Sequence, residues 1–219
     1  MAHHDRTTAT GRIATVEALT ALGRVRLSQN FFMREMLYSE VSNIHGVPNV
    51  PDDADVAVEA GRKLCAHILE PLRLKFGHVS IRSAYRSATL NAFCNARYLA
   101  GDTACWCTDN QANAARHIWD LRDAEGHMGA TATVVIPSYL DHYGRTGDYR
   151  PLAWWIRDHI PDFAEIFFFR ELCAFNIRWY SGPADKAIWF LDPPVRELLT
   201  KAGENGREGG HAHAYAGIL

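Results

Sequence analysis

Four side chains that can bind a cation lie within eleven residues near the middle of the chain: His117, Asp120, Asp123 and His127. Neutral imidazole and carboxylate groups are common protein ligands of zinc and of non-haem iron. A turn that folds back on itself would bring these groups together, so the segment is a candidate cation site. The alternative is a solvated turn in which the acidic groups pair with Arg122.

A second pair of imidazoles, His211 and His213, lies near the end of the chain. Alternate residues of a β-strand point to the same side, so an H-x-H pair on a strand can chelate a metal. The alternative is a loose tail, because residues 202–210 are rich in Gly and Glu. If a catalytic cation is bound, we expect zinc, or iron as the alternative. The expected ligands are His117, Asp123 and His127 together with His211.

The five cysteines predict reduced thiols. Their number is odd, their density is low, and the polar start of the chain has no apolar signal segment. This usage is typical of cytoplasmic proteins, so we expect a cytoplasmic location. Cys105 and Cys107 form a C-x-C pair, which is only a weak metal signal and is more typical of a loop.

The elements that must position these groups follow from the hydrophobic pattern. It predicts helices over residues 15–23, 31–44, 54–76, 88–99 and 152–159, and strands over 78–83, 130–137, 165–169, 175–180 and 187–191. Residues 101–129 are polar, with a helix or turn over 110–119. Helices that precede strands without βαβ alternation favour an α+β fold, in which N-terminal helices pack on a small, mainly antiparallel sheet.

Length and composition predict one globular domain. We divide the 219 residues into an N-terminal extension (1–27), an α+β domain (28–200) and a Gly/His-rich tail (201–219). The net charge is −2, which gives no basic excess for nucleic acid. No run approaches the roughly 18–20 apolar residues of a membrane span. The oligomeric state is left open.

Two segments of the first half carry a resemblance to a known family. The first contains S-Q-N-F at 28–31 and G-V-P-N-V-P at 46–51; the second contains L-E-P-L-R at 69–73 and S-A-Y-R-S at 83–87, followed by Asn91. Residues 28–95, under a third of the chain, resemble the N-terminal part of the zinc D-Ala-D-Ala carboxypeptidase-like peptidases. That family includes phage endolysins and D,D-dipeptidases.

The resemblance implies roles for several residues. Arg86, at the end of the S-x-Y-R motif, would hold the substrate carboxylate or the developing oxyanion, which suits the bidentate fork of a guanidinium. Ser83, Tyr85 and Arg178 are the further substrate-binding candidates, and Glu165 is the acidic residue expected to activate water. The alternative for Arg86 is a surface arginine, or one paired with a structural carboxylate.

The metal motif of the family is broken in this sequence. Its element S-x-H-x-x-G-x-A-x-D is matched best by residues 126–134, where His127 stands at the His but Val134 stands at the Asp ligand. An alignment through His117, with Asp120 or Asp123 as the carboxylate, has the wrong spacing. The strand at 175–180, which resembles the W-x-H element, has Trp179 but no His. Catalytic zinc usually has three protein ligands, so the standard site is incomplete.

Three functions are compatible with these residues. The first is a metal-dependent hydrolase with rearranged ligands that acts on a small peptide or amide with a free carboxylate. The second is a non-hydrolytic binding or accessory protein that keeps the fold but has lost zinc. The third is a small-molecule enzyme of different chemistry that uses a His/carboxylate metal site.

Overall fold

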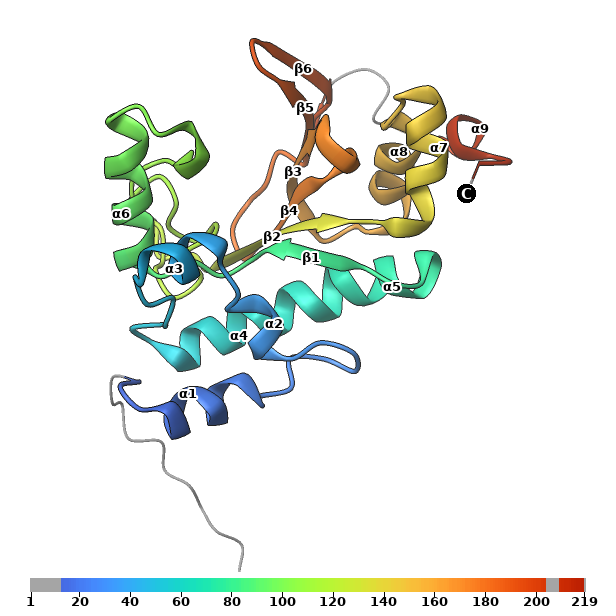
Figure 1. The fold of residues 1–219 in the computed structure, drawn as a ribbon. Helices are drawn as coiled ribbons and strands as arrows, with labels where there is room; N and C mark the ends of the chain where they lie inside the picture. Colours follow the sequence, from blue (N-terminus) through green and yellow to red (C-terminus); the bar gives the residue numbers. More distant parts are fainter. Residues whose placement is uncertain (1–12, 204–208, 219) are drawn as a thin grey trace, which may run out of the picture.

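The computed structural model describes residues 13–203 and 209–218. Within them, six strands form one sheet in the order β1-β2-β4-β3-β5-β6 (Figure 1). Only β3 and β5 pair in parallel; the other neighbours are antiparallel. The strands are β1 (Ser80–Ser83), β2 (Gly129–Val135), β3 (Phe163–Phe169), β4 (Phe175–Tyr180), β5 (Ala187–Asp192) and β6 (Val195–Thr200). The α+β class and the mainly antiparallel sheet are as predicted.

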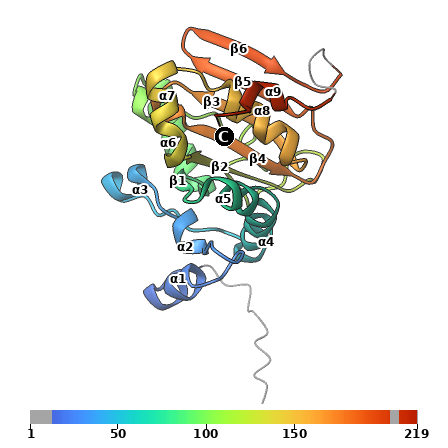
Figure 2. The ribbon, with the colours of Figure 1, turned by 90° about the vertical axis from the view of Figure 1, so that its right-hand side faces the viewer.

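The described helices surround this sheet unevenly. In Figure 1, α4 and α5 run below β1 and β2, α7 and α8 lie to the right of the sheet, and α6 lies to its left; Figure 2 shows α9 against α8. Within residues 13–203 and 209–218, every helix is too short or too polar to cross a bilayer. The helices are α1 (Val16–Gly23), α2 (Met33–Met36), α3 (Glu40–His45), α4 (Ala54–Leu64), α5 (Glu70–Phe76), α6 (Ala88–Leu99), α7 (Leu140–Thr146), α8 (Arg150–His159) and α9 (Ala212–Tyr215).

Several predicted elements differ in detail from the observed ones. The single helix expected over 31–44 is two short helices: α2 ends at Met36, and Ser39 caps the start of α3 by accepting a hydrogen bond from the Ser42 backbone N–H (3.3 Å). The expected helix over 54–76 contains a π-helical turn, η1 (Cys65–Leu69), between α4 and α5. Residues 110–119 form turns without a helix, and α7 and β6 were not predicted.

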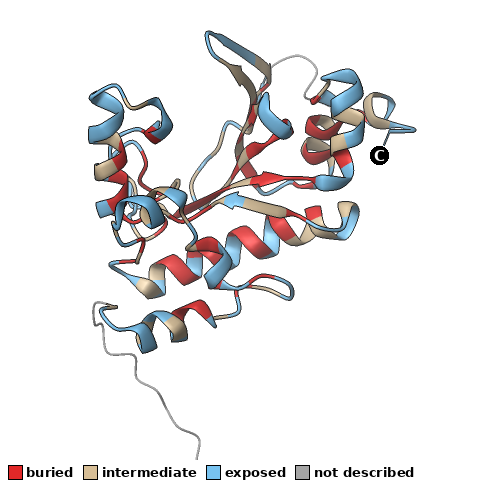
Figure 3. Ribbon diagram, in the orientation of Figure 1, coloured by how far each residue is buried: buried red, intermediate tan, exposed pale blue. Residues whose placement is uncertain are grey.

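The main core lies between α4 and one face of the sheet. Alternate residues of the two central strands, Ala132 and Val134 in β2 and Phe175 and Ile177 in β4, are fully buried in it. Figure 3 shows the buried side of α4 turned toward the sheet. The strict alternation leaves the intervening residues of both strands on the opposite face.

The N-terminal segment is part of the same domain. Leu22 and Leu27 belong to the main core, so the described part of the predicted 1–27 extension packs on the domain; residues 1–12 lie outside the described residues. Glu70 ties this region down by accepting hydrogen bonds from the Ser28 hydroxyl (2.6 Å) and from the Asn30 backbone and side-chain amides (2.8 and 2.7 Å). Burial opposes ionisation of Glu70, but these bonds outweigh it and lower its pKa.

Candidate functional site

A cavity of about 290 Å³ lies on the sheet face that α4 does not cover. It is walled on one side by the strands and on the other by the loop that follows α6. Its lining residues are Ser83, Arg86, Trp106, Cys107, Thr108, Asn113, Arg116, His117, Thr131, Thr133, Glu165, Phe167, Phe169, Asn176 and Arg178.

Strand register places the polar side chains of the cavity together. Thr131 pairs with Arg178 and Thr133 with Asn176 across β2 and β4, and Glu165 of β3 pairs with Arg178. Cross-strand partners share a face of the sheet. Residues far apart in the sequence therefore converge because the three strands align in this register.

The loop at 113–118 carries two further side chains, Arg116 and His117, onto this face. It is fixed by backbone hydrogen bonds from Thr131 to the Arg116 carbonyl (2.9 Å) and from Arg86 to the His117 carbonyl (2.8 Å). Ala115 has a positive φ of 52°, and a Cβ added at Gly129 would lie 2.0 Å from the Ala115 carbonyl oxygen. Only glycine at position 129 permits this approach of the loop to β2.

His117 is held as a neutral imidazole. Its Nδ1 lies 2.8 Å from the Ala84 carbonyl oxygen, which can only accept, so Nδ1 carries the proton and Nε2 is an acceptor. Burial is the main cause that lowers the pKa of His117 to about 4; the positive charges of Arg86 and Arg116 act in the same direction, and the Ala84 bond opposes them. At neutral pH the ring therefore adds no charge to the cavity.

The cavity has an excess of positive charge. Among the described residues that line it, three are arginines and one, Glu165, is acidic. Arg116 forms an ion pair with Glu165, whereas the Arg86 guanidinium contacts the neutral Asn91 side chain (3.3 Å). Burial and the neighbouring Arg116 lower the pKa of Arg178 to about 10, although Glu165 opposes this, so Arg178 remains charged at neutral pH. The arrangement is suited to an anion.

The residues of the cavity do not fit a three-ligand zinc site. Of its lining residues, Cys107, His117 and Glu165 carry groups of the kinds that bind zinc, but the one group of such side chains at ligand spacing among the described residues lies elsewhere, at Asp123, Glu125 and His127. The Thr133 hydroxyl donates to the Asn176 side-chain carbonyl (2.6 Å), and both groups are neutral. Zinc in proteins prefers imidazole, thiolate and carboxylate ligands.

Thr133 and Asn176 were missed from the sequence. Val134, which aligned with the missing Asp, is fully buried in β2 and packs in the core, as expected for an apolar strand residue. The sequence signal for Thr133 was the alternation of Thr131 and Thr133 with Ala132 and Val134, which predicts a polar face and an apolar face for this strand.

The four expected metal ligands do not meet. Asp123 and His127 lie side by side in the turn before β2, where their ligand atoms and that of Glu125 are within 4.8 Å of one another. His211 instead stacks on Trp154 of α8 (4.0 Å between ring centroids). Its Nδ1 lies 3.0 Å from a carboxylate oxygen of Asp158. The predicted set, which also includes His117 in the cavity, is therefore corrected: it is divided among three places.

Four of the five residues expected to act in catalysis or substrate binding lie at the cavity, and the fifth does not. Ser83, Arg86, Glu165 and Arg178 all line the cavity. Tyr85 does not: its side chain is only 1% exposed, and its hydroxyl donates to Asp120 (3.0 Å). The predicted substrate-binding role of Tyr85 is thus wrong, because its aromatic ring fills the core and faces Trp119.

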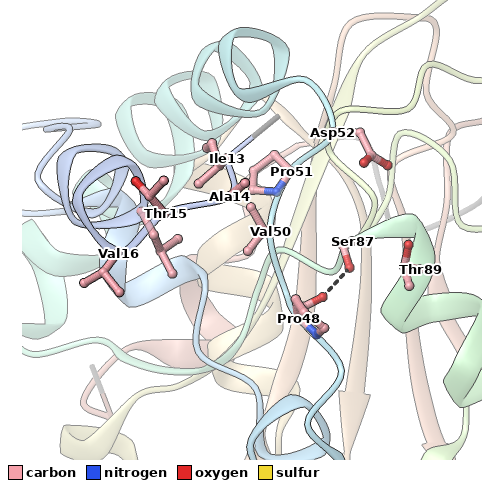
Figure 4. Close-up of a pocket in the computed structure, with 11 residues that line it drawn as sticks. Ile13, Ala14, Thr15, Val16, Pro48, Val50, Pro51, Asp52, Ser87 and Thr89 are labelled. Carbon is pink, nitrogen blue, oxygen red and sulfur yellow. Dashed lines mark hydrogen bonds between the residues drawn. The ribbon is translucent and has the colours of Figure 1, made fainter. Parts of the chain in front are cut away.

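A second cavity, of about 490 Å³, lies between the start of α1 and the loop at 48–52 (Figure 4). Its polar groups already serve the fold. Thr15 caps α1, and the Ser87 hydroxyl donates to the Pro48 carbonyl (3.1 Å). Among the described residues that line it, only Asp52 is ionisable, so it offers less chemistry than the cavity on the sheet.

Comparisons of this chain with protein-family models, with curated proteins and with solved structures found no match.

Proposed function

We propose that this protein binds a small carboxylate-bearing molecule, such as the free end of a short peptide, in the sheet cavity, without a catalytic zinc ion. The observation that carries the proposal is the composition of the cavity. Three guanidinium groups face one carboxylate, and Thr133 and Asn176 stand beside a neutral His117. Such a cavity favours an anion and offers poor support for a cation.

Each group has a role in this proposal. Arg86 supplies the fork for the carboxylate, since the side chains that it contacts, Asn91 and Cys107, leave its charge without a carboxylate partner at hydrogen-bond distance among the described residues. His117 Nε2 accepts a hydrogen bond from an N–H group of the ligand. Phe167 and Phe169, both half-buried, provide the apolar surface for the ligand body. Glu165 acts by orienting Arg116, because their ion pair occupies the carboxylate that would otherwise activate water.

Titration calorimetry with N-acetyl-D-Ala-D-Ala and its C-terminal amide tests the proposal. We expect the acid to bind and the amide to bind at least about tenfold more weakly, because a charge-assisted hydrogen bond contributes roughly 1.5–3 kcal/mol. Arg86→Ala should weaken binding of the acid by a similar factor. Arg145→Ala is the matched control, since Arg145 is exposed on α7.

Addition of zinc or of a chelator should leave the affinity unchanged. Equal binding of acid and amide, no binding of the acid, or an affinity that requires zinc would contradict the proposal.

A metal-dependent enzyme, with zinc or iron, is the second candidate. The observation that favours it is the proximity of Asp123, Glu125 and His127. Elemental analysis of untagged protein, compared with a His127→Ala variant, tests it: a metal retained by the parent and lost from the variant would support this function. We place either function in the cytoplasm, a proposal supported by the five cysteines, all of them buried and free.

A further inference from the structure

The sheet cavity continues along the open face of the sheet. A neighbouring cavity of about 430 Å³ shares three of its lining residues, Arg116, Glu165 and Arg178. The two cavities therefore adjoin at the Arg116–Glu165 ion pair, and we refer to them together as the groove. The second part of the groove is lined further by Ala164, Tyr180, Pro183, Ala184, Asp185, Ala187, Trp189, Arg196 and Lys201.

The register of β3 with β5 shows that this groove follows a single face of the sheet. Phe167 pairs with Trp189 in the parallel ladder, so both side chains lie on the open face. Arg196 of β6 extends back over this face, with its guanidinium 4.2 Å from the centre of a Trp189 ring. With strands about 4.8 Å apart, the groove covers roughly 10 Å from β4 to β5.

The second part of the groove is also rich in positive charge. Glu165 is the ion-pair partner of Arg116 and the cross-strand partner of Arg178, and Asp123 also favours the charged form of Arg178. Arg178 is half-buried, and the ring centre of Tyr180 lies 4.0 Å from its guanidinium. The Arg178 Nε–H is used by the Ala115 carbonyl (2.9 Å). A half-buried guanidinium with a second arginine beside it is stabilised when a further anion binds.

We infer that the groove binds an elongated ligand with two acidic groups. One group lies at Arg86, and the second lies between Arg178 and Arg196, beyond the Arg116–Glu165 pair. The body of the ligand crosses Phe167 and approaches Trp189. This inference rests on the proposed function, since it adds a second anion subsite to the same carboxylate-binding cavity.

A matched pair of probes separates the two subsites. N-acetyl-D-Ala-D-Ala carries one carboxylate, whereas N-succinyl-D-Ala-D-Ala adds a second at its other end; the same pair with three D-Ala residues extends the span by roughly 3.5 Å. We expect the better succinyl probe to bind at least about tenfold more tightly than its acetyl partner.

Variants of the full chain assign the gain to the second subsite. Arg196→Ala should remove the advantage of the succinyl probe and leave the acetyl affinity unchanged, and Arg196→Lys should keep part of the advantage. Arg86→Ala should weaken both probes, and Arg145→Ala neither. Arg196 is exposed on β6, so its replacement is compatible with folding, which far-UV circular dichroism checks.

The possible outcomes distinguish a failure of the second anion subsite from a failure of the proposed carboxylate-binding function. If the acetyl probes bind but neither succinyl probe binds more tightly, the second subsite is refuted and the proposed function stands. The same holds if Arg196→Ala weakens both kinds of probe equally. If no probe binds, both are refuted.

Discussion

The two faces of the central sheet are built from the same strands but from opposite kinds of side chain. On the face toward α4, Val134 and Ile177 are fully buried in an apolar core. On the open face, their neighbours Thr133 and Asn176 are half-buried and hydrogen-bonded to each other. Neighbouring residues of one strand therefore lie on opposite faces, one in the core and the next in the cavity. An alignment that is correct for the strand can still assign the wrong residue to the cavity.

The largest effect should come from placing the missing acid of the family motif on the wrong face. Val134→Asp buries a carboxylate without a partner, and we expect it to lower the free energy of unfolding by more than about 4 kcal/mol. Thr133→Asp is the matched variant on the open face, where solvent and nearby arginines reach the charge. We expect it to change stability by less than about 1 kcal/mol.

Urea unfolding followed by circular dichroism measures both variants. Similar losses for Val134→Asp and Thr133→Asp would refute the assignment of the two residues to different faces.

A smaller effect is expected where the loop at 113–118 meets β2. Gly129→Ala puts a Cβ 2.0 Å from the Ala115 carbonyl oxygen, and both partners are backbone atoms that cannot turn aside. We expect a loss of about 3 kcal/mol in thermal or urea unfolding, together with weaker binding of N-acetyl-D-Ala-D-Ala, because the loop carries Arg116 and His117.

Gly144→Ala is the control for this substitution. Gly144 lies in α7, and an added Cβ meets no atom within 4 Å, so alanine should stabilise the helix by up to about 1 kcal/mol. An equally stable Gly129→Ala would show that the loop does not depend on this close approach.

The smallest effect concerns the pH dependence of the open face. The folded protein has a His117 pKa of about 4, below the unfolded value of 6.5, so the unfolded chain binds the proton more readily. The contribution of His117 to the free energy of unfolding is present above about pH 6.5 and is lost as the pH falls toward 4. Between pH 7 and pH 4, we expect the free energy of unfolding of the wild-type protein to fall by about 2 kcal/mol more than that of His117→Gln.

Urea unfolding of both proteins at several pH values provides the measurement. Carboxylates such as Glu70 lose stabilising contacts in acid in both proteins, so they cancel in the difference. Parallel pH profiles would contradict a neutral, buried His117.

Local pattern predicted much of the fold. The β-branched run of β2 and the apolar spacing of α4 identified both elements, whereas Arg86 and Glu165, which line the cavity, were candidates only through the family resemblance. Tyr85 was selected for its place in the S-A-Y-R-S motif, and a short motif does not show that its tyrosine turns into the core, where its hydroxyl donates to Asp120. The meeting of Arg86, Arg116 and Arg178 depends on long-range register and on one loop, which local sequence does not encode.

The π-helical turn η1 sets the rotational phase of everything that follows α4. At this turn the Glu70 backbone N–H bonds to the Cys65 carbonyl, five residues back, so the turn holds one residue more than α-helical geometry requires. If the same residues instead formed a continuous α-helix, α5 would be rotated by about 100° relative to α4. Glu70 would then turn away from Ser28 and Asn30. The wide turn thus absorbs one residue and keeps the Glu70 carboxylate directed at the N-terminal segment.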